Sequence, residues 1–170
     1  MSDDNTSVTF VLREGMVTHD GSPVNAEMVV WNIENRVTNA ERGAALYTEF
    51  APWYESVEAL DELTVRINFT GPTPHAPDLL ALLAITDPDM FIRDDGTEAL
   101  ANQQDKQIGS GPFVLVEYVP GSHIRYDRFD DYWEEGVPMI SGIDVIIYGD
   151  AASMVAALEA GEVDYIFNPP

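Results

Sequence analysis

The sequence predicts an α/β protein in which an α+β part is followed by part of a mixed β-sheet. Three stretches carry this prediction. Residues 8–37 combine a strand, a turn and a helix, residues 56–69 have the pattern of a hairpin, and residues 143–167 run strand, helix, strand. A chain of 170 residues with 45% apolar residues can form a real core, because a domain of this size buries roughly two-thirds of its unfolded surface.

The first stretch begins as a strand and continues as an amphipathic helix. Every second residue from Val8 to Leu12 is strongly apolar, which is the period of a strand with one buried face. Residues 20–23, Asp-Gly-Ser-Pro, then reverse the chain, because Gly allows a positive φ and Pro forbids further strand pairing. Asn25 is a good N-cap. Apolar residues follow it at helical spacing: Ala26, Val29, Val30, Ile33 and Val37.

The middle of the chain predicts a hairpin between weaker helices. Residues 40–51 have a helical pattern that ends at Pro52. From Ser56 to Phe69 apolar and polar residues alternate around a turn at Asp61-Glu62, which is typical of a hairpin. Pro77 opens a short helix over residues 78–84, and a further short helix is predicted near residues 97–104.

The last third predicts strands and one helix. Two glycines around Ser110 allow a sharp turn, after which residues 113–119 and 124–128 alternate as two strands joined at Pro120-Gly121. Residues 143–148 have the pattern of a buried strand. Residues 151–160 predict a helix ended by Gly161, and residues 163–167 begin one more strand. This order predicts a βαβ unit that feeds a parallel pair in a larger sheet.

The charge is the dominant feature of the composition. Thirty acidic residues oppose 8 basic ones, for a net charge of −22, and the acids are spread along the chain. Such a surface repels phosphate backbones, so nucleic acid is not an expected partner. Few lysines and dispersed acids suit a halophilic protein, in which salt screens the self-repulsion. The absence of cysteine excludes disulfides and thiolate chemistry without placing the compartment.

No targeting or membrane-spanning segment is predicted from the sequence. The first seven residues are polar rather than signal-like, and no apolar run approaches the roughly 18 residues that a membrane helix needs. On these grounds alone the chain is either cytoplasmic or separated from its targeting segment.

Several motifs together resemble family 5 of the extracellular solute-binding proteins, the peptide, dipeptide and nickel receptors of ABC importers. Leu12-Arg13 with the Asp-Gly-x-Pro turn at residues 20–23 is similar to the family's first motif. The hairpin at residues 56–65 resembles its second. Ile108-Gly-Ser-Gly-Pro-Phe, Asp131-Tyr-Trp and residues 157–164, Ala-Leu-x-x-Gly-Glu-Val-Asp, resemble three later motifs in the family's order.

Two positions depart from the family pattern. Thr18 stands where an aromatic residue is common, and Phe129-Asp130 replaces an Asn-Pro pair, so the turn before Tyr132 lacks its proline. These departures affect local turns, whereas the order of the motifs covers nearly the whole chain.

The resemblance implies a fragment of a periplasmic-binding-protein type 2 fold. Residues 1–107 would be the inserted α+β subdomain of the first lobe, residues 108–170 part of that lobe's sheet, and the second lobe would be absent. The implied function is extracytoplasmic capture of a peptide or related small solute for an ABC permease, with no reaction and no cofactor. The full-length protein would act at the cell surface or in the periplasm, membrane-anchored through a missing segment.

Five residues are candidate ligand contacts. Gly109, Ser110 and Gly111 would lie at the edge of a cleft between two lobes, as the resemblance implies. Trp53 and Tyr54 follow a proline in a predicted loop, where aromatic rings can stack on a ligand. In contrast, Trp31 and the Tyr132-Trp133 pair are expected to pack within the core or under the sheet.

Two other classes of function remain open at this point. The acidic runs at residues 87–89 and 127–131 suggest a cation-dependent interaction or adhesion module, although neither has the spacing of a helix-loop-helix calcium site. A small hydrolase would need Ser110 within hydrogen-bond reach of a histidine. His19, His75 and His123 have no repeated metal-ligand spacing, so no metal site and no catalytic residue is predicted.

Overall fold

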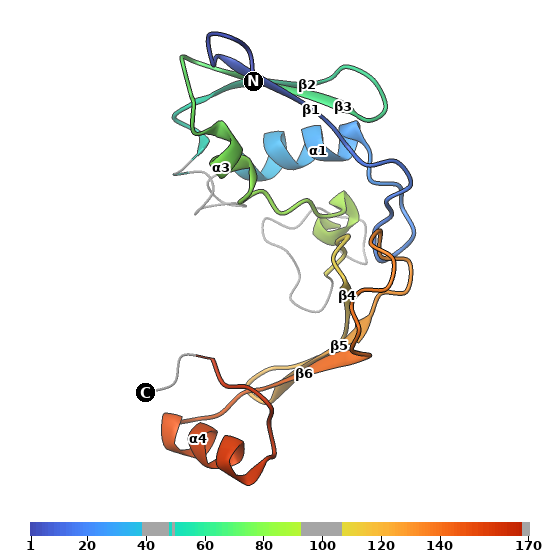
Figure 1. Cartoon of the computed structure of the whole chain (residues 1–170), viewed down its shortest axis with the longest axis vertical. Coiled ribbons are helices and arrows are strands. Elements are labelled where there is room, and N and C mark those ends of the chain that lie inside the picture. Colours follow the sequence, from blue (N-terminus) through green and yellow to red (C-terminus); the bar gives the residue numbers. More distant parts are fainter. Residues whose placement is uncertain (39–47, 49, 93–106, 168–170) are drawn as a thin grey trace.

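A computed structural model describes residues 1–38, 48, 50–92 and 107–167. The helices predicted at residues 40–51 and 97–104 lie almost entirely outside these residues. In the described part of the chain two separate three-stranded sheets form, and each half of the chain also contains one main helix. Figure 1 shows the first sheet and α1 at one end of the molecule and the second sheet with α4 at the other.

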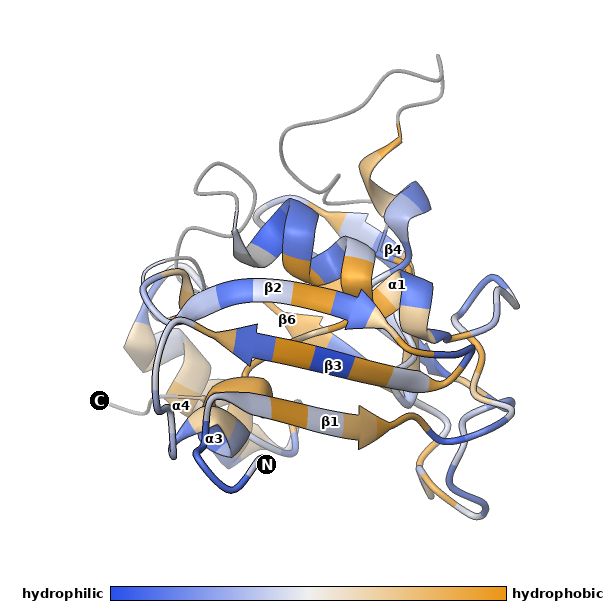
Figure 2. Cartoon of the chain, turned by 90° about the horizontal axis from the view of Figure 1, so that it is seen from above, coloured by the Kyte–Doolittle hydropathy of each residue, from blue (hydrophilic) through white to orange (hydrophobic). Residues whose placement is uncertain are grey.

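The first sheet contains β1 (Ser7–Val11), β2 (Tyr54–Ala59) and β3 (Thr64–Phe69). The strand order is β1-β3-β2 and both pairs are antiparallel, with Ile67 of β3 opposite Val8 and Val57. The alternation of apolar and polar residues along these strands, visible in Figure 2, places one face of the sheet in the core. The predicted first strand and hairpin are therefore confirmed.

Helix α1 (Ala26–Asn32) lies under this sheet. The predicted cap is confirmed, because the Asn25 side chain accepts a hydrogen bond from the Met28 N–H at 2.9 Å. The helix continues as a π-helical turn, η1 (Ile33–Val37). The apolar face of α1 packs against the strands and forms one core cluster, whose buried members are Val8, Ala26, Val29, Ile33, Phe50, Val57, Val65, Ile67, Phe69, Ala76 and Leu79.

Two short helices complete the first half. Helix α3 (Ala76–Leu80) has Pro77 in its first turn, as predicted, but it ends earlier than the predicted residue 84. A 3₁₀ turn, η2 (Pro88–Phe91), follows and is capped by Asp87, whose side chain accepts from the Asp89 N–H. Phe91 is buried and its ring lies 5.5 Å from that of Trp31.

The second sheet contains β4 (Phe113–Val119), β5 (His123–Arg128) and β6 (Gly142–Ile146) in that order, with both pairs antiparallel. Gly142 is required in β6, because a Cβ there would lie 2.6 Å from the Tyr126 carbonyl oxygen. Helix α4 (Ala151–Ala160) begins at Asp150, which accepts from the Ser153 N–H, and ends at Gly161 with φ 74°. The predicted end of this helix at Gly161 is therefore confirmed.

Two predictions for the last third are wrong. Residues 163–167 form no strand, so the predicted βαβ unit and its parallel pair are not present in the described residues. Strand β6 is also not buried, since Ile143, Val145 and Ile146 are 38%, 41% and 46% exposed. From β4 to the end of the described residues, only two apolar residues are buried, Phe129 and Ala157. The second sheet therefore has one polar face and one apolar face that is exposed to solvent.

None of the helices in the described part of the chain has the length and apolar character that a membrane crossing requires.

Candidate functional site

The loop Gly109–Gly111 lies where the chain passes from the first half to the second sheet. Its start pairs with the first half, because Thr86 and Gly109 form an antiparallel bridge. The Asp87 N–H also donates to the Ile108 carbonyl at 2.9 Å. Since β4 begins only two residues after the loop, the predicted cleft-edge residues stand at the junction between the two sheets.

His19 also contacts this loop. Its backbone N–H donates to the Gly109 carbonyl at 2.8 Å. In the opposite direction, the Gly109 N–H donates to the imidazole Nδ1 at 3.3 Å, and Nε2 lies 3.0 Å from the Gly111 carbonyl oxygen. Because both ring nitrogens are engaged by the backbone, His19 has none left for Ser110. Within the described residues the Ser110 hydroxyl forms no hydrogen bond with a histidine, and the hydrolase hypothesis therefore has no support.

A pocket with aromatic and acidic lining residues lies around the turn that follows β5. It has a volume of about 540 Å³, and Phe129, Tyr132 and Trp133 are among its lining residues. The Phe129 ring packs edge-on against His19 at 5.0 Å, which connects this pocket with the loop. Trp133 is 42% exposed and its ring lies 4.3 Å from the guanidinium carbon of Arg13. The prediction that Trp133 packs under the sheet is therefore wrong.

Buried polar groups of the first half hold the segment that pairs with the loop. Asn32, 1% exposed, donates to the Thr86 carbonyl at 2.8 Å and accepts from the Thr86 N–H at 3.1 Å. Arg36 donates to the Ala84 carbonyl at 2.6 Å and to the Thr86 hydroxyl at 3.1 Å. Burial lowers the pKa of the Arg36 guanidinium below its ordinary value. These bonds extend the support of Gly109 back to helix α1.

Trp53 and Tyr54 lie elsewhere in the first half. Trp53 is 41% exposed and its ring packs edge-on against His75 at 5.2 Å. Tyr54 is half-buried, with its ring 6.2 Å from Phe50. Burial, together with the negative charge of Glu34, raises the pKa of Tyr54. No hydrogen bond or ring contact among the described residues joins these aromatics to the Gly109–Gly111 loop.

Three carboxylates gather near the junction. Asp20, Asp87 and Asp89 each offer an oxygen within 4.8 Å of the others. Asp20 accepts from the Thr18 hydroxyl at 2.5 Å and from the Ser22 N–H at 3.1 Å, and Asp87 accepts from the Asp89 N–H at 2.8 Å. These bonds cap local turns, and acidic groups commonly gather without an ion. We therefore assign no metal to this cluster.

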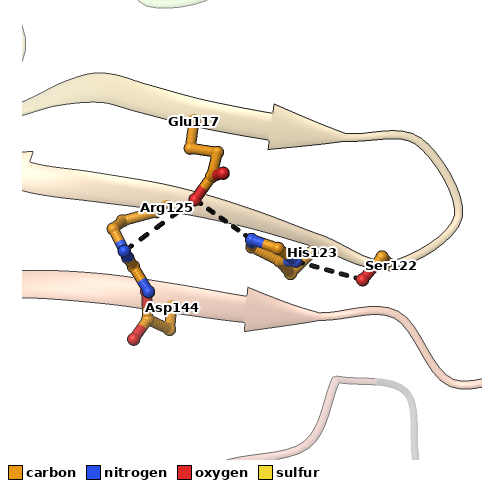
Figure 3. Close-up of polar contacts among 5 residues, drawn as sticks. All are labelled: Glu117, Ser122, His123, Arg125 and Asp144. Atoms are coloured by element: carbon orange, nitrogen blue, oxygen red, sulfur yellow. Dashed lines mark hydrogen bonds and ion pairs between the residues drawn. The ribbon is translucent and has the colours of Figure 1, made fainter.

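A second serine and histidine meet on the polar face of the second sheet, as Figure 3 shows. The Ser122 Oγ lies 3.0 Å from His123 Nδ1, and Nε2 of the same ring lies 3.2 Å from Glu117. Arg125 adds ion pairs with Glu117 at 3.8 Å and with Asp144 at 2.9 Å. All these side chains are at least partly exposed, so the network joins the strands across a solvated face rather than forming an active site.

Comparisons with known proteins show what the chain is similar to. A family model described as "Bacterial extracellular solute-binding proteins, family 5 Middle" matches residues 1–170. A probable peptide ABC transporter periplasmic-binding protein, y4tO of Sinorhizobium fredii, is 29% identical over 100% of this chain and 33% of its own. Heme-binding protein A of Haemophilus influenzae is 30% identical over 99% of this chain and 34% of its own.

A solved structure agrees with these sequence matches. HbpA2 from Haemophilus parasuis superposes with a TM-score of 0.83 at 28% identity, over 99% of this chain and 36% of that one. The chain thus spans about a third of the length of the relatives that it matches.

Proposed function

The chain belongs to family 5 of the bacterial extracellular solute-binding proteins, and we propose that it serves in the capture of a small solute for an ABC importer. The match of the family model over residues 1–170 carries this proposal. The predicted α/β class and type 2 periplasmic-binding-protein fold are confirmed by the structural likeness. The relatives include a probable peptide-binding protein, a heme-binding protein and a glutathione-binding protein, and we propose a peptide or related small solute for this protein.

The arrangement of the junction supports binding rather than a reaction. Phe129 lines a partly aromatic pocket and packs against His19, whose two ring nitrogens are both engaged by the backbone of the loop Gly109–Gly111. Aromatic walls and main-chain groups are features of small-molecule sites. We propose that this loop is one edge of the solute cleft and that the protein catalyses no reaction.

Trp53 and Tyr54 remain proposed ligand contacts, but they lie apart from the loop Gly109–Gly111. Trp53 is exposed enough to stack on a solute, but its neighbour is His75 rather than the loop. A solute held by the loop would therefore not be expected to reach these two rings at the same time.

The proposed domain organisation is a lobe completed by further polypeptide. Residues 1–107 would form the inserted α+β subdomain and residues 108–170 part of the sheet of the first lobe. The remaining strands and the second lobe would come from a longer protein, which is supported by the greater length of the relatives. The open apolar face of β6 is consistent with such a completion.

The proposed location is outside the cytoplasmic membrane, with an ABC permease as partner. The relatives include periplasmic-binding proteins, and anchoring to the membrane is proposed for the longer protein. The net charge of −22 supports a halophilic origin. The alternative of a cation-dependent adhesion module finds no support in the relatives, which are importer components.

Calorimetric titration with a mixed pool of di- to oligopeptides tests the proposal. The 170-residue chain should bind no tighter than about millimolar, or roughly −4 kcal/mol, because one wall of the cleft is missing and polar contacts stay in water. The complete protein should bind in the micromolar range or tighter. Micromolar binding by the 170-residue chain alone contradicts the two-lobed site.

A pair of serine variants tests the placement of the cleft in the complete protein. Ser110→Ala should weaken peptide binding by about tenfold, the effect of losing one hydrogen bond of ordinary strength. Ser122→Ala, on the exposed face of the second sheet, is the matched control and should leave the affinity unchanged. Equal affinities for both variants contradict the assignment of the loop to the cleft.

A further inference from the structure

His19 holds both ends of the loop Gly109–Gly111. At the first end, its backbone N–H and its Nδ1 form a reciprocal pair of bonds with Gly109. At the second end, Nε2 contacts the Gly111 carbonyl oxygen at 3.0 Å. Ser110 therefore stands between two residues that are both bonded to one side chain.

Only one tautomer of His19 satisfies both ends. The Gly109 N–H is a donor, so Nδ1 must accept and carry no proton. A carbonyl oxygen can only accept, so Nε2 must carry the proton that it donates to Gly111. The contacts thus require a neutral imidazole protonated on Nε2.

The two ends of the loop are not equally supported. Gly109 is also bridged to Thr86, and the preceding carbonyl of Ile108 accepts from the Asp87 N–H. Gly111 has no hydrogen bond within the described part of the chain other than the one with His19. The contact from Nε2 therefore holds Gly111 itself, while the next residue, Pro112, accepts a hydrogen bond from the Phe129 N–H.

The imidazole is itself held from two sides. Its own turn is closed by the Thr18 N–H, which donates to the Ser22 carbonyl at 2.9 Å. On the other side its ring packs edge-on against Phe129, which is 8% exposed and whose N–H donates to the Pro112 carbonyl at 2.9 Å. The ring is thus fixed both by its own turn in the first half and by Phe129, which in turn bonds Pro112, the residue after the loop.

We infer that His19 is the positioning residue of the Gly109–Gly111 loop, and that it determines where Ser110 stands at the edge of the cleft. The inference rests on the proposed solute-binding function. Glycine has the greatest backbone freedom of any residue, so a loop with glycine on both sides of Ser110 needs its position set from outside. Within the described residues, the Ser110 N–H and hydroxyl form no hydrogen bond and remain available to a solute.

Three substitutions separate hydrogen bonding from packing. His19→Asn places an acceptor near Nδ1, His19→Gln places a donor near Nε2, and His19→Phe keeps a ring against Phe129 without either bond. His123→Phe, whose native ring contacts Glu117 on the solvated face of the second sheet, is the matched control. If His19 acted only by packing, the His19→Phe variant would behave as the wild type.

Nuclear magnetic resonance of the 170-residue chain gives the readouts. Amide hydrogen exchange of Gly109 should be roughly 2- to 10-fold faster in His19→Phe and His19→Gln than in the wild type, the range expected for one net hydrogen bond, and slow in His19→Asn. The ¹³C shift of the Gly111 carbonyl should move in His19→Phe and His19→Asn and be retained in His19→Gln. The wild-type imidazole should carry its proton on Nε2.

The inference is overturned if both readouts in His19→Phe match those of the wild type. It is also overturned if the imidazole of the wild-type protein carries its proton on Nδ1. The imidazole measurement needs no variant, so the test stands even if a substitution prevents folding. In the complete protein, His19→Phe should weaken binding of the peptide pool by about tenfold, and His123→Phe should not.

The peptide-binding measurement distinguishes failure of the proposed function from failure of the inference about His19. If the complete wild-type protein binds no peptide, the proposed function fails, while the resonance data still decide whether His19 holds the loop. If the loop readouts change as expected but the variant binds peptide as tightly as the wild type, the role of His19 at the cleft is overturned.

Discussion

The side chain of Asn32 hydrogen bonds to both the N–H and the carbonyl of Thr86, 54 residues further along the chain. The buried amide of Asn32 thus forms the two hydrogen bonds that a neighbouring strand would otherwise form with the backbone of Thr86. Because Thr86 in turn bridges Gly109, the bond pair connects helix α1 with the candidate cleft edge.

Asn32→Ala should therefore lower the free energy of unfolding by about 2–3 kcal/mol, since buried partners are left unsatisfied. Asn35→Ala on the same helical segment is the control. Among the described residues its amide donates only to the Trp31 carbonyl, and the loss should be within about 0.5 kcal/mol. Urea denaturation of both variants measures the difference. Similar losses for the two variants contradict this account.

Isoleucine truncations should distinguish the two sheets. Ile67→Ala, at a side chain with 0% exposure, should cost about 2–5 kcal/mol because it leaves a cavity in the core. Ile143→Ala, 38% exposed on β6, should change the free energy of unfolding by less than about 0.5 kcal/mol. Urea denaturation again provides the measurement. A large loss for Ile143→Ala in the 170-residue chain would mean that the β6 face is already covered.

The turn at Asp20 should respond to acid. Burial raises the pKa of Asp20, but hydrogen bonds from the Thr18 hydroxyl and Ser22 outweigh it, and the net pKa is lowered. A lowered folded pKa means that the stabilisation by ionised Asp20 is fully present above the unfolded pKa of about 3.9. It is lost as the pH falls through the folded pKa.

Carboxyl ¹³C resonances recorded between pH 2 and 6, in steps of roughly half a unit around the usual aspartate range, report this pKa directly. Thr18→Val removes the hydroxyl donor at a residue that is 1% exposed, and the pKa of Asp20 should rise. Unchanged titration of Asp20 in Thr18→Val argues against the hydrogen bond as the cause.

Salt should stabilise the fold. A net charge of −22 disfavours compaction until counterions screen it, and the screening length falls from about 10 Å at 0.1 M to about 3 Å at 1 M salt. The melting temperature should therefore rise from low to molar potassium chloride. Sodium chloride at equal ionic strength should have a similar effect, and a flat response counts against a halophilic origin.

Local signals in the sequence were sufficient for much of the fold. Asn25 and Gly161 were predicted as helix ends because capping depends on residues a few positions away. The hairpin was predicted because alternation and its turn lie within one short stretch. The strand predicted at residues 163–167 did not form, because a strand needs a partner that local pattern does not supply.

The exposure of β6 could not be predicted for a related reason. Ile143 and Val145 indicate an apolar face, but the pattern contains no information about which element, if any, covers it. At the candidate site, the turn at Gly109–Gly111 was recognised from its glycines. His19 was not, because its bonds to the loop span 90 and 92 residues and a lone histidine has no spacing signal.

The strand order β1-β3-β2 also has a consequence for the time course of folding. Hairpin β2–β3 closes across only a few residues, whereas Val11 of β1 meets Thr64 across roughly fifty. This longer closure costs about 2 kcal/mol more in chain entropy, so the hairpin is expected in the transition state and β1 joins afterwards. Among the three strands of this sheet, β1 is thus made first and is expected to pair last.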